Sequence, residues 1–142
     1  MKVLLVDDEE MFRIAVAKQL SVRGYTVHEA GTGEEGVAMA QKLSLDVVLL
    51  DMRLPGMNGT ATLKEIKRVS PLTEIIMLTG HATVKAAMEA ISMGAFDYMT
   101  KPMAIDDLIY KMEDAHKKKQ LAKQKIQVNS TTANKKEKEQ KQ

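Results

Sequence analysis

Five short apolar runs, separated by segments with helical patterns, constrain the fold more than any other feature of this sequence. The runs are rich in β-branched and aliphatic residues, and each has the length of one buried strand. We predict strands near 2–6, 25–30, 46–51, 74–79 and 96–100. Strict alternation of strand and helix indicates a parallel sheet with helices on both faces, which is a three-layer α/β domain.

The segments between the strands carry apolar side chains at helical spacing. Three such stripes are Phe12, Ala15, Val16 and Leu20; Val84, Ala87, Met88 and Ile91; and Ile105, Leu108, Ile109 and Met112. Gly24 and Gly94 stand where two of the helices should end, and Thr32 with Glu35 has the spacing of a capping box. Five strand–helix units are too few to close a barrel, so we expect an open sheet.

The composition changes after His116. Residues 1–116 contain 12 Lys and Arg against 17 Asp and Glu, a net charge of −5, whereas residues 117–142 contain 9 against 2, a net charge of +7. We therefore predict one folded domain over 1–116 and a basic polar tail over 117–142. The tail is too polar to bury a second core, so we expect the last helix to extend into it and then give way to disorder. We expect no folded output domain within this chain.

Charge and composition exclude several classes of function. An acidic domain binds polyphosphates poorly, and the basic tail has no aromatic residues on which bases could stack, so we expect no nucleic-acid binding. Steep salt dependence of binding to DNA would indicate otherwise. The chain has no Cys, which excludes disulfides, thiolate zinc sites and Cys nucleophiles. The apolar runs are shorter than the ~20 residues of a membrane helix, and the N-terminus lacks a signal-peptide pattern, so we expect a cytoplasmic protein without membrane contact.

Polar and charged side chains follow the predicted strands at their carboxyl ends, where ligands bind in an open α/β sheet. These residues are Asp7 and Asp8 after the first strand, Asp51 after the third, Thr79 after the fourth, and Lys101 with Pro102 after the fifth. Clustered carboxylates repel one another unless a cation lies among them, and oxygen ligands suit Mg²⁺, for which Mn²⁺ could substitute. A lysine beside such a site implies an anion, most simply a phosphoryl group.

Asp51 is the candidate nucleophile. It stands alone at the end of a continuous apolar run, whereas Asp7 and Asp8 are adjacent and better placed to share a metal. A carboxylate can attack phosphorus and form an acyl phosphate. Thr79 and Lys101 would then each contact one phosphoryl oxygen.

The joint pattern over residues 1–116 resembles the receiver domain of two-component response regulators. That family has an acidic pair after the first strand, a lone Asp after the third, Ser or Thr after the fourth and Lys-Pro after the fifth. The segments 51–59 and 94–102 match it closely. The resemblance implies a chemotaxis-regulator-like, flavodoxin-like sandwich with strand order 2-1-3-4-5, and a cis Lys101–Pro102 bond as in many relatives.

The resemblance also implies the chemistry. Asp51 would accept a phosphoryl group from a phosphohistidine of a sensor histidine kinase or phosphotransfer protein. The Mg²⁺ ligands would be Asp8, Asp51, the backbone carbonyl of Arg53 and, partly through water, Asp7. Thr79 and Tyr98 would form the switch pair. The chain would be a phosphoacceptor regulator and not an enzyme, although it would assist its own phosphorylation and slow autodephosphorylation.

Arg53 and His81 would flank the path of the hydrolytic water and modulate the lifetime of the phosphoryl group. The output would be a downstream protein or an output domain outside this chain, and the resemblance allows a phosphorylation-dependent homodimer. The region 78–102 resembles receivers attached to ATP-driven transcription activators. A free-standing receiver and a piece of a longer regulator therefore both stay open.

Three other functions fit the residues less well. Gly31–Gly36 matches G-x-G-x-x-G, but Glu34 and Glu35 would occupy the helix N-terminus that a dinucleotide pyrophosphate needs, so we interpret the glycines as turn residues. A Mg²⁺ phosphatase would have a second Asp two residues after its nucleophile on the first strand. A flavin-binding module would have Ser, Thr and Gly after that strand, where this chain has four acids.

Overall fold

The computed structural model describes residues 1–80 and 83–140 and contains five strands and five helices in strict alternation. In chain order they are β1 (Lys2–Val6), α1 (Glu10–Ser21), β2 (Thr26–Ala30), α2 (Gly33–Lys42), β3 (Val47–Asp51), α3 (Gly59–Val69), β4 (Glu74–Thr79), α4 (Val84–Ser92), β5 (Asp97–Thr100) and α5 (Ile105–Gln140). All neighbouring strands pair in parallel, in the order β2-β1-β3-β4-β5. The predicted fold class and strand order are confirmed.

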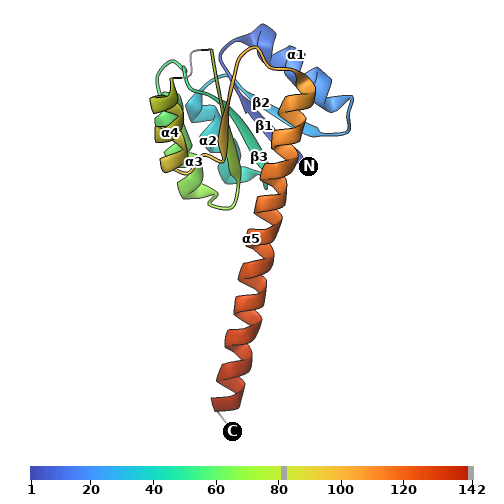
Figure 1. Cartoon of the computed structure of the whole chain (residues 1–142), viewed down its shortest axis with the longest axis vertical. Helices are drawn as coiled ribbons and strands as arrows, with labels where there is room; N and C mark the ends of the chain where they lie inside the picture. The colour runs from blue at the N-terminus through green and yellow to red at the C-terminus, as the bar shows by residue number, and fades with distance from the viewer. Residues whose placement is uncertain (81–82, 141–142) are drawn as a thin grey trace.

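Two apolar layers hold the sheet between the helices. Side chains alternate along each strand, so Leu4 and Val6 of β1 pack under α2, α3 and α4, whereas Val3 and Leu5 pack under α1 and α5. Figure 1 shows the same division, with α1 and α5 on one side of the sheet and α2, α3 and α4 on the other. Both faces of β1, β3 and β4 are covered, which explains why these strands contain the continuous apolar runs Val3–Val6, Val47–Leu50 and Ile75–Leu78.

Helix α4 is present, but its predicted apolar face is wrong at three of its four residues. Val84 is 73% exposed, Met88 65% and Ile91 46%, whereas Ala87 and Ala90 are buried. Small alanine side chains let α4 lie close to the sheet, and the bulkier residues consequently face solvent. Gly24 and Gly94 end their helices with positive φ angles, as predicted.

The interpretation of the G-x-G-x-x-G segment as turn residues is wrong at two of its three glycines. Gly33 and Gly36 lie inside α2, at its close contacts with α3 and β1. A Cβ atom at Gly33 would stand 2.1 Å from Thr62 Oγ1, and one at Gly36 would stand 3.0 Å from Val6 Cγ2. Thr32 caps α2 by accepting the Glu35 N–H, so this segment serves helix packing and capping.

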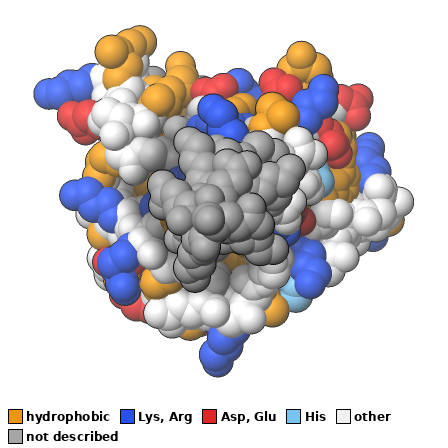
Figure 2. Space-filling view, turned by 90° about the horizontal axis from the view of Figure 1, so that it is seen from below, with side chains coloured by type: hydrophobic (Ala, Val, Ile, Leu, Met, Phe, Trp, Pro, Cys, Tyr) orange, Lys and Arg blue, Asp and Glu red, His pale blue; other side chains and the backbone are white. Residues whose placement is uncertain are grey.

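Helix α5 passes through residue 116 without a break and projects from the domain as a rod (Figure 1). Lys119 is 8% exposed and donates to the Leu45 carbonyl at 2.8 Å and to Asp46 Oδ1 at 2.9 Å. The first turn beyond 116 therefore still contacts the domain. Viewed from the end to which α5 points, Lys and Arg side chains are scattered over the visible described surface without forming a continuous strip (Figure 2). No helix among the described residues is both long and apolar enough to cross a membrane.

Candidate phosphoryl and metal site

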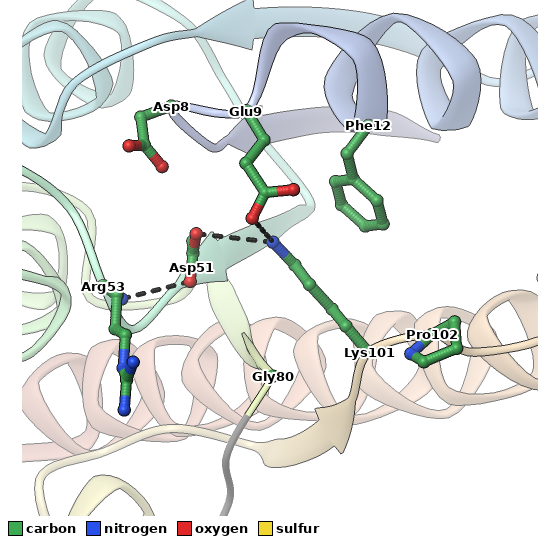
Figure 3. A pocket seen from close by; sticks show the side chains of 8 residues that line it. All are labelled: Asp8, Glu9, Phe12, Asp51, Arg53, Gly80, Lys101 and Pro102. Atoms are coloured by element: carbon green, nitrogen blue, oxygen red, sulfur yellow. Dashed lines mark hydrogen bonds and ion pairs between the residues drawn. The ribbon is translucent and has the colours of Figure 1, made fainter.

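The carboxyl ends of β1, β3, β4 and β5 meet at one edge of the sheet. Val6 pairs with Leu50, and Asp51 pairs with Leu78, so the residues that follow each strand converge. They surround an open cavity of about 520 Å³ (Figure 3). Its lining residues are Asp8, Glu9, Phe12, Asp51, Arg53, Gly80, Lys101 and Pro102.

Three carboxylates gather beside this cavity. Asp7, Asp8 and Asp51 each place one oxygen within 4.8 Å of the others. Asp7 and Asp51 are buried, whereas Asp8 is exposed. Burial raises the pKa of Asp51, and the charge of Asp7 raises it further, while the Arg53 N–H and Lys101 act in the opposite direction. A hard divalent cation would relieve this repulsion, so the donor set fits Mg²⁺.

Lys101 supplies the positive charge of the site. Its Nζ atom lies 2.5 Å from Asp7 Oδ2, 3.3 Å from Asp51 Oδ2 and 3.8 Å from Glu9 Oε1. Burial alone would lower the pKa of Lys101, but the hydrogen bond and charge of Asp7, together with Asp51 and Glu9, hold it above its ordinary value. The side chain is therefore an ammonium ion directed at the candidate nucleophile (Figure 3).

Backbone contacts orient the acidic residues. Asp7 accepts the Glu9 N–H on Oδ1 at 2.8 Å, and Asp51 accepts the Arg53 N–H on Oδ1 at 3.0 Å. Each carboxylate thus uses one oxygen to fix its own turn, and in each residue the other oxygen, Oδ2, faces Lys101. The Lys101 N–H donates to the Thr79 carbonyl at 2.7 Å, and the Lys101–Pro102 peptide bond is cis, as expected from the resemblance.

Sequence reasoning missed three residues of α1 and the turn before it. Arg13 donates from Nη1 to the Asp7 carbonyl at 2.7 Å, Glu9 pairs with Lys101, and Phe12 presents its ring to the same ammonium. The available signal was helical spacing, because Phe12 and Arg13 follow Glu9, the N-cap of α1, by three and four residues and so lie on the same side of the helix. Phe12 was instead predicted as a core residue only, and it is half-buried.

Thr79 and Tyr98 lie on the same face of the sheet. Tyr98 pairs with Met77, and both pack in the layer under α2, α3 and α4. Thr79 is two residues beyond Met77 on β4, so side-chain alternation directs it to that layer too. Thr79 is buried and Tyr98 half-buried.

His81, the remaining predicted residue, is outside the described residues. Arg53 lines the cavity, and its exposed side chain extends away from Lys101 (Figure 3).

The response regulator receiver domain family matches residues 3–113 of the chain. The chain belongs to this family. Among curated relatives, the DNA-binding transcriptional regulator NtrC of Salmonella typhimurium is 37% identical over 92% of this chain and 28% of its own length. The regulatory protein AtoC of Escherichia coli is 36% identical over 75% of this chain and 23% of its own length. This receiver domain therefore spans less than a third of these relatives.

Solved structures agree with the family assignment. A CheY-like receiver domain protein from Methanospirillum hungatei is 29% identical, with a TM-score of 0.81 over 85% of this chain and 97% of that one. The receiver resemblance is thus confirmed at the level of both sequence and fold. NtrX from Brucella abortus, solved with ADP, is 32% identical with a TM-score of 0.84, and the match covers 89% of this chain and 29% of NtrX.

Proposed function

We propose that this receiver is a phosphorylation-dependent switch in which Asp51 is the phosphoacceptor. The observation that carries the proposal is the position of Lys101, which lines the cavity and whose ammonium bridges the buried carboxylates of Asp7 and Asp51. A cation at this place can neutralise the charge of an incoming phosphoryl group, and the adjacent carboxylate can attack phosphorus.

The reaction would begin with a phosphohistidine of a sensor kinase or phosphotransfer protein. A carboxylate oxygen of Asp51 forms a bond to phosphorus while the bond from phosphorus to the histidine nitrogen breaks, and the electron pair of that bond stays on the imidazole. Lys101 compensates the charge on the phosphoryl oxygens. The chain is therefore a phosphoacceptor whose product is a modified form of itself.

Mg²⁺ would be held by Asp8 and Asp51, by the backbone carbonyl of Arg53 and, partly through water, by Asp7. When bound, it would supply positive charge to the phosphoryl oxygens. The cluster of acidic oxygens within 4.8 Å supports this ligand set, and Mn²⁺ could replace Mg²⁺ because it accepts the same oxygen ligands.

Thr79 and Tyr98 would convert phosphorylation into a change of shape. The Thr79 hydroxyl would move toward the phosphoryl group, and the space it leaves would admit the Tyr98 ring, since both lie on one sheet face. This is a shift between two packings, with β5 and α4 as the responding elements. A downstream protein or an output domain outside this chain would recognise the changed conformation.

Intact mass spectrometry tests the central assignment. With Mg²⁺ and phosphoramidate, the parent should gain one phosphate adduct, and Asp51→Asn should gain none. Asp97→Asn is a matched control, because Asp97 is a half-buried acid at the start of β5 that pairs with Lys111. An adduct on Asp51→Asn at the parental rate would overturn the proposal.

A further inference from the structure

Lys101 has a fourth neighbour that is not an acid. Its Nζ atom lies 4.2 Å from the centroid of the Phe12 ring, within the range of a cation–π contact. Phe12 comes from α1 and Lys101 from the end of β5, and both line the cavity that contains Asp51 (Figure 3). The Lys101 side chain is only 11% exposed, so little water competes with the ring for the ammonium.

An aromatic ring suits this position because of how an ammonium group bonds. Lys101 has three N–H donors, and its hydrogen bonds to Asp7 and Asp51 use two of them. Glu9, at 3.8 Å, is too far for a hydrogen bond. The face of the ring attracts the positive charge, but it has no lone pair that would accept a hydrogen bond from the ammonium. With respect to the described residues, one donor therefore remains for a further oxygen ligand.

The ring also limits where the ammonium can go. A lysine side chain has several rotatable bonds and loses substantial entropy when it is held in one place. Two carboxylates attract Lys101 toward the floor of the site, and the Phe12 ring attracts it from the α1 side. Together they keep Nζ 3.3 Å from the oxygen of Asp51.

We propose that Phe12 is a positioning residue for phosphoryl transfer, holding the Lys101 ammonium beside Asp51 through its ring face. This inference rests on the proposed function of Asp51 and adds a residue to it. The alternative role for Phe12 is packing, since it also contacts the apolar layer under α1 and α5. An experiment must therefore change the electrostatics of the ring while keeping its volume.

The chain has two phenylalanines, Phe12 and Phe96, which makes such an experiment practical. Phe96 packs against the same apolar layer, and its ring lies 5.7 Å from Lys118. Phe96→Leu is thus the matched control and also the background in which fluorinated phenylalanine enters only at position 12. Successive fluorination weakens the negative ring face with little change in size.

The first measurement is the rate of phosphorylation by phosphoramidate at saturating Mg²⁺, followed by intact mass. With mono-, di- and trifluorinated phenylalanine at position 12, the rate should fall stepwise, to about a third to a tenth of the Phe96→Leu value. Phe12→Leu should show a similar loss, whereas Phe96→Leu should stay near the parent. A rate that is independent of fluorination would overturn the proposal and assign Phe12 to packing.

The second measurement does not depend on phosphorylation. The Cε protons of Lys101 should be shifted upfield by the ring current of Phe12, and the shift should vanish in Phe12→Leu. An unshifted Lys101 signal in the parent would overturn the contact itself. A parent that shows the shift but gains no phosphate would instead overturn the function proposed for Asp51, and with it the part of Phe12 in that function.

Discussion

The ammonium nitrogen of Lys101 lies 3.3 Å from Oδ2 of Asp51, although the two residues are 50 positions apart in the chain. The parallel register of β3, β4 and β5 brings them together, because Asp51 pairs with Leu78 and Thr79 pairs with Thr100. Each residue stands at the carboxyl end of its own strand, so the sheet brings their backbones to the same edge, and the side chains span the remaining distance. The same geometry allows the charges of the site to be tested one at a time.

Mg²⁺ should stabilise the domain through the carboxylate cluster. A ligand that binds only the folded state at ten times its dissociation constant adds about 1.4 kcal/mol to the free energy of unfolding. We expect this gain in the parent and little of it in Asp8→Asn, measured by urea unfolding with and without Mg²⁺. Asp114→Asn, an exposed acid on α5, should keep the parental gain. Equal gains in both variants would remove Asp8 from the ligand set.

Replacement of the Asp51 carboxylate should stabilise the protein at neutral pH. Burial raises the pKa of Asp51, so the folded state binds a proton more readily than the unfolded state, and the charged carboxylate disfavours folding. Asp51→Asn should therefore raise the free energy of unfolding at pH 7 by on the order of 1 kcal/mol in the absence of Mg²⁺. The difference should shrink as pH falls through the raised pKa of Asp51, where the parent becomes protonated.

Urea unfolding followed by circular dichroism at neutral and acidic pH measures this difference. Glu29→Gln on β2, an exposed acid outside the cavity, serves as the control. A variant that is less stable than the parent at pH 7 would show that attraction to Lys101 exceeds the cost of burial and repulsion.

Phosphorylation and switching should separate at Thr79. Thr79→Ala removes the hydroxyl that we expect to move toward the phosphoryl group, but it leaves Asp51 and Lys101 intact. The variant should gain the phosphate adduct and lose most of the accompanying amide shift changes in β5 and α4. Thr26→Ala, at an exposed position on β2, should keep them. Parental shift changes in Thr79→Ala would contradict the switch role.

Lys119 should contribute to stability although it lies in the basic tail. Its ammonium donates to the Leu45 carbonyl and to Asp46 at the edge of the sheet opposite the phosphoryl site. Lys119→Ala should lower the free energy of unfolding by about 1 to 3 kcal/mol, because the Leu45 carbonyl and the Asp46 carboxylate each lose one charged donor, although they keep the Thr73 hydroxyl and the Lys2 N–H. Lys123→Ala, at an exposed position on the next turn, should change it by less than about 0.5 kcal/mol. Similar losses of unfolding free energy in Lys119→Ala and Lys123→Ala would show that the buried contacts of Lys119 add nothing to stability.

Strand positions and strand-end residues were predictable because they depend on local patterns. Apolar runs define the strands, and parallel strands bring their carboxyl ends together whatever the loops between them do. Asp7, Asp51 and Lys101 were found on that basis.

Contacts that depend on how a helix is rotated against the sheet could not be predicted in the same way. Met88 belongs to a regular apolar stripe but faces solvent, because Ala87 and Ala90 pack closer. In the sequence, Phe12 resembles any core residue. Only the fold shows that the Lys101 ammonium, at the end of β5, lies beside its ring. Lys119 lies in a segment with the composition of a solvated tail, and only the direction of α5 brings it to Asp46.

The lifetime of the phosphoryl group should depend on Arg53. Its backbone N–H fixes the Asp51 carboxylate, while its exposed side chain lines the cavity. Hydrolysis requires a water molecule in line with the leaving oxygen, and a long guanidinium at the rim can obstruct that approach. Arg53 cannot act as a base at neutral pH, so its effect is shielding.

Arg53→Ala should speed dephosphorylation about threefold, equivalent to ~0.6 kcal/mol in the barrier, and Arg53→Lys should retain most of the protection. His81, outside the described residues, is expected to act in the opposite sense by orienting the water, so that His81→Ala slows the decay. Decay of the phosphate adduct after removal of phosphoramidate, at saturating Mg²⁺, measures both rates. Because the Arg53 backbone N–H is retained in every variant, a faster decay reports the side chain alone. A decay rate in Arg53→Ala equal to that of the parent would mean that the guanidinium does not reach the path of the water.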